Sequence, residues 1–173
     1  MIKLCGALLI ISGTTCYGLF LAFQKKSRIQ RLKALKETFI ILMGQIRFAK
    51  SPIPQAFLMI AEKSCYTYIH DFYKYVSESL SRRTCKEFSE AWNMGIDLFI
   101  QDIFLTESDC AIIKNVGNMP LYLDAQMQLS ILEETNSEID KLITEAEKDI
   151  REKCRIYQSA GFILGLLIVL ILI

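Results

Sequence analysis

Residues 4–23 are LCGALLIISGTTCYGLFLAF, a run that contains no charged side chain. About 20 residues at 1.5 Å each form roughly 30 Å of helix, the thickness of the hydrocarbon core of a bilayer. A second uncharged run, IYQSAGFILGLLIVLILI at residues 156–173, gives roughly 27 Å of helix. We therefore predict an N-terminal transmembrane helix over residues 1–23 and a C-terminal transmembrane helix over residues 156–173.

Basic residues flank both runs on the side that faces the middle of the chain. Four of them form a membrane-proximal basic flank after the first run: Lys25, Lys26, Arg28 and Arg31. Four more precede the second run: Lys148, Arg151, Lys153 and Arg155. Because Lys and Arg concentrate in cytoplasmic loops, the sequence predicts a cell-membrane protein with two spans and a cytoplasmic domain over residues 24–155. The flanking cations would contact lipid headgroups of the bilayer, a position that argues against nucleic acid as a partner.

The first apolar run is expected to remain as an anchor. It is too long for the apolar part of a signal peptide, and no small-x-small cleavage site precedes a polar start. The residues before Cys16 do not form a lipobox. The six cysteines show no CxxC pair and no metal-ligand spacing, so we expect unpaired, mostly buried thiols and predict no metal and no cofactor.

Apolar residues recur at three- and four-residue steps through most of residues 24–155, which is the spacing of amphipathic helices. No segment shows the alternation of a strand bounded by turns. The expected fold class is all-α, a membrane-anchored helical bundle of about six cytoplasmic helices. These helices are predicted to begin near residues 24, 54, 67, 84, 106 and 124.

Local signals support several of these boundaries. The first helix should continue the first apolar run as far as Ser51-Pro52-Ile53-Pro54, because proline lacks the N–H that a helix interior needs. Thr84 and Glu87 have the spacing of a capping box, and Thr106 is predicted to open a further helix with Glu107 and Asp109 in its first turn. Gly117 is predicted to end the helix that Thr106 opens. The last helix should run without interruption into the second apolar run.

The first and last cytoplasmic helices carry opposite charges. Residues 24–50 hold eight Lys or Arg against the single acid Glu37, and residues 130–147 hold six acids against Lys141. Both helices extend membrane spans, so they must run antiparallel, and their charges can pair. Exposed ion pairs contribute about 0 to 1 kcal/mol each, so we expect them to set register rather than stability.

The sequence contains none of the common motifs for nucleotide binding or hydrolysis, among them GxxxxGK[ST], GxGxxG, GxSxG and HExxH. His70 is the single histidine, and its neighbour Asp71 points about 100° away on a helix. Trp92 falls on the apolar stripe of its helix and is predicted to lie in the core. We therefore do not expect an enzyme.

Small residues within the spans suggest helix packing. Gly161 and Gly165 form a GxxxG pair, and Gly6 is one of the small residues of the first run. Glycines on one face allow a second helix to approach closely. The packing partner is either the other span of the same chain or another protein, and a homo-oligomer is possible. The spans contain no ionisable residue, which argues against an ion pathway.

The connection before the last helix is unusually apolar. It contains Met119, Pro120, Leu121 and Tyr122, which we take as a candidate partner-binding loop. These side chains either contact a partner at the end of the domain away from the membrane or pack into the core of the domain itself.

Short motifs over the whole chain, in order, resemble the stage III sporulation protein AB family. They are Lys3-Leu4-Cys5-Gly6-Ala7, Thr14-Thr15, Gly18, residues 28–35, Gln45-Ile46, residues 51–56, Glu90-Ala91-Trp92, Gly117, Asp124, Gln128 and residues 161–167. The family usually has Glu where Gln45 stands and a Leu-Gly pair where Pro120-Leu121 stands. The first departure removes a charge on which a contact at position 45 could depend. The second is expected to change the conformation of the loop before Asp124.

The resemblance implies a domain similar to the cytoplasmic domain of the platform protein F of type II secretion systems. It implies a subunit of the mother-cell membrane around the forespore, in a secretion-like channel required for endospore formation. Its partners would be a secretion-type ATPase similar to stage III sporulation protein AA and the other membrane proteins of that complex. The family contributes no catalytic residues. Our reading of the sequence is a non-enzymatic membrane platform subunit, and the alternative is a membrane-anchored adaptor or scaffold outside any secretion apparatus.

Overall fold

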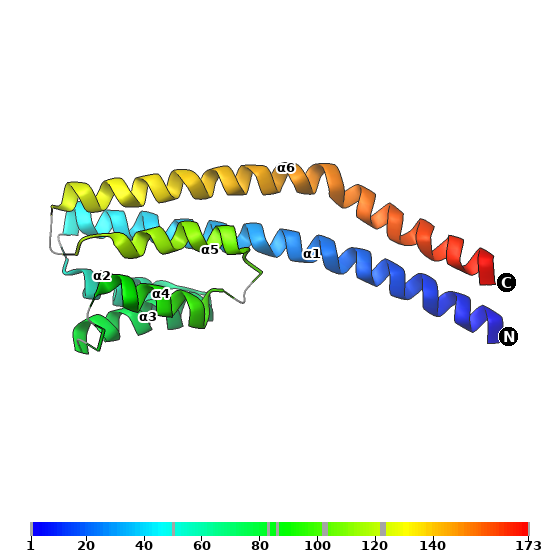
Figure 1. Ribbon diagram of the computed structural model, residues 1–173, viewed down its shortest axis with the longest axis horizontal. Coiled ribbons are helices and arrows are strands. Elements are labelled where there is room, and N and C mark those ends of the chain that lie inside the picture. Colours follow the sequence, from blue (N-terminus) through cyan, green and yellow to red (C-terminus); the bar gives the residue numbers. More distant parts are fainter. Residues whose placement is uncertain are drawn as a thin grey trace. The chain divides into compact units, whose positions relative to one another are not determined.

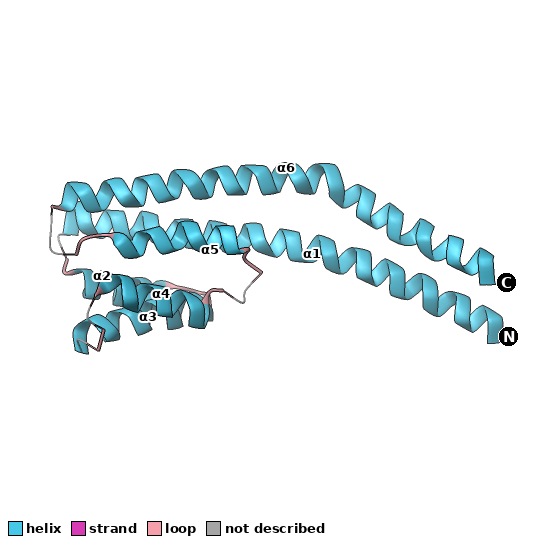
Figure 2. Ribbon diagram, viewed as in Figure 1, coloured by secondary structure: helices cyan, strands magenta, loops and turns pink. Residues whose placement is uncertain are grey.

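The computed structural model describes the backbone of residues 2–49, 51–82, 84–85, 87–101, 104–121 and 124–172, and the side chains within these ranges at residues 12, 13 and 16–150. Its α-helices are α1 (Ile2–Gly44), α2 (Ile53–Lys63), α3 (Thr67–Arg82), α4 (Phe88–Phe99), α5 (Glu107–Lys114) and α6 (Ala125–Leu172). A π-helix, η1 (Gln45–Ala49), continues α1, and a 3-10 helix, η2 (Asn115–Asn118), follows α5. The described residues contain no strand, which confirms the all-α prediction (Figure 2).

The chain divides into two compact units. One consists of Met1–Ile29 and Thr144–Ile173, and the other, which we call the helical domain, is Gln30–Ile143. Within the helical domain, α6 runs antiparallel beside the end of α1, and the shorter helices α2 to α5 fill the connection between them (Figure 1). The breaks at Pro52 and before α6 therefore both lie at one end of this domain.

Ion pairs join the two long helices in the register that their charges predict. In the helical domain, Lys36 Nζ lies 2.6 Å from Asp140 Oδ1 and Arg47 Nη2 lies 2.9 Å from Glu133 Oε1. In the other unit, Lys25 Nζ lies 4.0 Å from Asp149 Oδ2. The side chains of these pairs are 30% to 56% exposed, so water screens them, and their contribution to stability is small.

The core of the helical domain is built around Trp92 of α4, which is fully buried as predicted. Its ring centroid lies 4.9 to 6.3 Å from the aromatic rings of five neighbours on α1 to α4: Phe39, Phe57, Phe72, Tyr73 and Phe88. The indole Nε1–H donates to the carbonyl oxygen of Ile113 at 2.9 Å, so the one polar group of this ring is also satisfied. This bond fixes the end of α5 against α4.

Two predicted helix boundaries are wrong. Thr84 does not cap α4, because the helix begins at Phe88 and the Thr84 hydroxyl instead donates to the carbonyl oxygen of Ser79, closing the end of α3. Gly117 does not end α5 in a left-handed conformation; it lies inside η2 with a negative φ. The helix start predicted at Thr106 is confirmed, because Thr106 is the N-cap of α5. Its side chain accepts from the N–H of Asp109, and the Asp109 carboxylate accepts from the N–H of Thr106.

Among the residues that the structure describes, none of the helices combines the length and the apolarity that a membrane crossing needs. Both predicted spans lie largely outside the described side chains, which exclude residues 1–11 and 151–173. Gly6, Gly161 and Gly165 fall in these ranges, so their role in helix packing stays a prediction.

Candidate partner-docking groove

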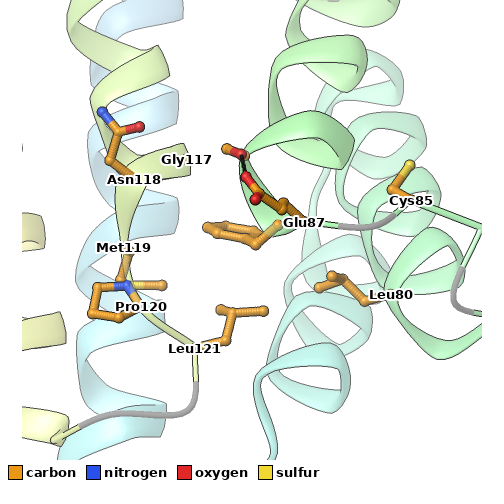
Figure 3. A pocket seen from close by; sticks show the side chains of 10 residues that line it. Leu80, Cys85, Glu87, Gly117, Asn118, Met119, Pro120 and Leu121 are labelled. Atoms are coloured by element: carbon orange, nitrogen blue, oxygen red, sulfur yellow. Dashed lines mark hydrogen bonds between the residues drawn. The ribbon is translucent and has the colours of Figure 1, made fainter.

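An open groove of about 770 Å³ lies on the helical domain beside the loop that leads into α6 (Figure 3). One wall comes from η2 and the loop after it, and the other from the end of α3, the α3–α4 connection and the start of α4. The lining residues are Leu80, Cys85, Glu87, Phe88, Ser89, Gly117, Asn118, Met119, Pro120 and Leu121. Two segments more than 25 residues apart in the sequence therefore form one surface, roughly 80–89 and 117–121.

Two contacts hold the wall formed by η2 and the loop after it. A Cβ at Gly117 would lie 3.0 Å from Trp92 Cδ1, so only a glycine allows η2 to pack this closely on the indole. The buried Gln128 side chain of α6 donates from Nε2 to the carbonyl oxygens of Pro120 and Leu121, at 2.8 and 3.2 Å. The loop is thus anchored to the core on one side and to α6 on the other, which makes the groove preformed.

The predicted partner-binding loop is only partly exposed. Met119 is 2% exposed and belongs to the core, so it is not part of a partner-binding surface. Pro120 and Leu121 are half-buried and form part of the groove wall. Tyr122 lies outside the described residues. Of the two readings of this loop, packing into the core therefore holds for Met119, and a surface position holds for its two neighbours.

Sequence reasoning missed the opposite wall. The spacing of Thr84 and Glu87 predicts the first turn of a helix, so it does not identify this segment as part of a groove wall. Glu87 precedes α4 in an extended conformation, and its carboxylate accepts a hydrogen bond from Ser89 Oγ at 3.2 Å. On this wall, the apolar side chains of Leu80 and Phe88 line the groove together with the acid Glu87.

The membrane-proximal basic flank is divided between different environments. Lys26 is exposed, and Lys25 and Arg28 are partly buried. The Arg31 guanidinium lies over the ring of Tyr68 on α3, 4.5 Å from its centroid, so it packs on the helical domain as a cation–π pair. Burial raises the pKa of Tyr68, although the nearby Arg31 opposes that shift.

The remaining candidates have structural roles. His70 Nδ1 lies 3.0 Å from the carbonyl oxygen of Ala61, as expected for a packed histidine. Of the cysteines with described side chains, Cys110 is buried, Cys85 is partly buried, and Cys16 and Cys65 are exposed. They are unpaired as expected, but the prediction of mostly buried thiols is wrong. Within the described ranges, His, Cys, Asp and Glu do not gather in groups of three that suit a metal ion.

Gln45 begins the π-helix η1. Its Oε1 is buried and finds no hydrogen-bond partner among the described residues. Asn136 Oδ1 on α6 is in the same situation. A carboxylate at position 45 would carry a charge into this partly buried site, so the amide lowers the desolvation cost there.

Residues 3–173 match the sequence model of a protein family described as stage III sporulation protein AB. The chain is 22% identical over 172 residues to stage III sporulation protein AB of Bacillus subtilis (strain 168), a match that spans 99% of each sequence. A solved structure titled stage III sporulation protein AB (SpoIIIAB) superposes with a TM-score of 0.64 and 17% identity, and covers 72% of this chain and 96% of that one. This likeness shows that the two share a fold.

Proposed function

The chain belongs to the stage III sporulation protein AB family, and from this membership we propose that it is a non-enzymatic membrane platform subunit of a secretion-like channel between mother cell and forespore. A role in sporulation is consistent with the family. The more specific role rests on three features of this chain, which are its two apolar ends, its all-helical domain and the preformed groove.

The position of the groove along the chain supports a platform. Gln128, which holds the groove loop, precedes the second predicted span by about 28 residues in the sequence. The groove residues, 80–121, all follow the first predicted span by more than 50 residues. A groove well separated in the sequence from both predicted spans is suited to a soluble partner that approaches from the cytoplasm.

The observation that carries the proposal is the groove itself, with the apolar side chains among its lining residues, its anchored loop and the acid Glu87. We propose that a secretion-type ATPase of the same complex, similar to stage III sporulation protein AA, inserts an apolar side chain there. A basic residue beside that anchor would pair with Glu87. The basic flank, in this proposal, rests on the cytoplasmic surface of the cell membrane.

Co-purification from sporulating cells tests this function. The detergent-solubilised full chain should bring down a secretion-type ATPase and other membrane proteins of the channel, and the purified chain alone should not hydrolyse ATP. Capture of neither class would favour the alternative, a membrane-anchored adaptor outside any secretion apparatus. ATP turnover by the pure chain would contradict the non-enzymatic role.

A further inference from the structure

Both long helices pass through the same end of the helical domain. α1 enters this domain at Gln30, and α6, which runs antiparallel to it, leaves the domain at Ile143 (Figure 1). Only residues 24–29 of α1 and residues 144–155 of α6 separate this end from the two predicted spans. A domain held by two tethers that leave from one end turns that end toward the membrane. We therefore call the end at Gln30 and Ile143 the membrane-facing end.

Two connections between short helices lie at the membrane-facing end. The connection between α2 and α3 is placed there by Arg31, whose guanidinium lies 4.5 Å from the ring centroid of Tyr68 in the first turn of α3. Figure 1 shows the end of α4 and the start of α5 at this same end. Each connection presents one exposed aromatic side chain, since Tyr66 is 48% exposed and Phe104 is 42% exposed.

Phe104 has a backbone conformation that its side chain disfavours. Its φ is 62°, and it is the one non-glycine residue with a positive φ in the part of the chain that the structure describes. Glycine and asparagine adopt this conformation readily, whereas a bulky side chain rarely does. The ring is not fully buried by its own chain, so burial there does not account for a phenylalanine at this position. A strained backbone that holds an aromatic ring outward points to a contact outside the chain.

Tyr66 is held in place by its neighbours. Its N–H donates to Ser64 Oγ at 3.2 Å, and its ring centroid lies 5.5 Å from that of Tyr68. Arg31, Tyr68 and Tyr66 thus form a row of one cation and two tyrosines. These side chains combine an apolar body with a polar tip, and tyrosine is enriched where the bilayer meets water.

We propose that Tyr66 and Phe104 insert their rings into the headgroup layer of the bilayer, so that the membrane-facing end rests on the membrane surface. Glu62 and Lys63 are both exposed on the last turn of α2, so the charges beside Tyr66 balance and the contact needs no anionic lipid. This contact rests on the proposed function, because it requires both predicted spans in one bilayer. It would leave the groove loop, at the other end of the domain, accessible from the cytoplasm.

Photo-crosslinking to lipid tests the contact directly. The full chain is reconstituted in vesicles of phosphatidylethanolamine and phosphatidylglycerol, and the photoreactive residue benzoyl-phenylalanine replaces Phe104 or Tyr66. After illumination we expect a covalent lipid adduct, detected as an increase in the intact mass of the chain. Phe48 is the matched control, since it is an aromatic residue that is 81% exposed in η1, at the other end of the domain. The same substitution there should give no adduct.

Two results of this experiment would overturn the proposal. One is an adduct yield from position 104 that is no higher than the yield from position 48. The other is a crosslink from position 104 to a second protein chain in place of lipid, which would show that a protein covers this end.

Phe104→Asn separates the membrane contact from folding. Asparagine tolerates the positive φ at this position, so the melting temperature of the solubilised chain should not fall. The lipid adduct from benzoyl-phenylalanine at position 66 should fall by roughly tenfold, the factor that the loss of one buried aromatic ring gives. An undiminished adduct from position 66 in the folded variant would overturn the proposal. A strongly lowered melting temperature would overturn it as well, because the ring would then belong to the core.

The same chain separates this inference from the proposed function. A chain that resists alkaline extraction from the vesicles and captures the ATPase, but gives no adduct at position 104, refutes the surface contact alone. A chain that gives the adduct but captures no ATPase supports the contact and refutes the platform role. Release of the chain from the vesicles by alkali would overturn both.

Discussion

Gly117 lies directly against the indole of Trp92, and a Cβ at this glycine would stand 3.0 Å from Trp92 Cδ1. This contact joins the candidate docking groove to Trp92, a fully buried aromatic side chain at the centre of the core of the helical domain. The groove wall and the core are therefore one packed structure. We expect some substitutions in this wall to lower the free energy of unfolding and others to weaken only the binding of a partner.

Gly117→Ala should destabilise the protein. The Trp92 ring cannot move away, because five aromatic neighbours surround it and its Nε1–H is bonded to Ile113. We expect a loss of about 1 to 3 kcal/mol in the free energy of unfolding, the usual cost of overpacking. Urea unfolding of the solubilised chain measures it. Gly44→Ala is the matched control and should be neutral or stabilising, since its Cβ meets no atom.

Leu121→Glu should abolish ATPase capture and spore formation while leaving the domain folded. Leu121 is half-buried on the groove wall. A carboxylate there would lose its hydration when an apolar side chain of the partner binds, and that desolvation cost opposes binding. Its neighbour Met119 is 2% exposed, so Met119→Ala should instead lower the free energy of unfolding by about 2 to 5 kcal/mol. Leu58→Glu, at a position 43% exposed on α2, serves as a surface control. A strongly lowered melting temperature for Leu121→Glu would place this residue in the core and the binding face elsewhere.

Tyr73 should make the protein sensitive to alkali. Thr38 Oγ1 donates to the carbonyl oxygen of Leu35 at 2.6 Å, so the Tyr73 hydroxyl donates to Thr38 at 2.7 Å. Burial raises the pKa of Tyr73 well above its usual value of about 10, although the bond to Thr38 opposes the shift. Above about pH 10 the unfolded chain loses this proton while the folded chain keeps it, so stability falls as pH rises.

Urea unfolding at pH 8 and pH 11 measures this effect. Tyr73→Phe should cost about 1 kcal/mol at pH 8, through the lost hydrogen bond, and should lose less stability than the wild type on going to pH 11. Tyr66→Phe, at a position 48% exposed, should leave the alkaline loss unchanged. An equal alkaline loss in wild type and Tyr73→Phe would contradict the assignment.

The cysteines report both topology and burial. A membrane-impermeant thiol reagent added to intact cells should label none of Cys65, Cys85 and Cys110, because residues 24–155 are predicted to be cytoplasmic. After permeabilisation, the exposed Cys65 should react first. Cys110 should react most slowly, since it is buried and burial, followed by the nearby Asp109, raises the pKa of its thiol. Labelling of any of the three before permeabilisation would contradict the cytoplasmic placement.

The ion pair between Lys36 and Asp140 should contribute to register and little to stability. Its side chains are 30% and 52% exposed, so a double-mutant cycle with Lys36→Ala and Asp140→Ala should give a coupling of less than about 1 kcal/mol. Thermal unfolding of the four proteins at low and high salt checks this, with a smaller coupling expected at high salt. A coupling that is several times larger, or insensitive to salt, would show that the pair is desolvated.

Local signals in the sequence were sufficient for most of the fold. The apolar residues at three- and four-residue steps gave the class and the six α-helices, and the prolines at positions 52 and 54 marked the end of the first long helix. The antiparallel direction of the first and last helices follows from their continuity with the two apolar runs, and the opposite charges of residues 24–50 and 130–147 form ion pairs in that arrangement. These features depend on neighbours within one or two helical turns, or on a simple balance of charge, so periodicity and charge counts detect them.

The groove was decided only by tertiary structure. Nothing near Met119 in the sequence distinguishes a buried methionine from an exposed one, and its burial follows from where Gln128 and Trp92 hold the loop. The spacing of Thr84 and Glu87 matched a helix cap, but the Thr84 hydroxyl instead donates to the carbonyl oxygen of Ser79 at the end of α3. Gly117 matched a helix end, whereas its requirement is the close approach of a ring 25 residues earlier in the chain. Such contacts join segments that only packing brings together, and for that reason the chain's helices follow from its sequence while its candidate binding surface follows from its fold.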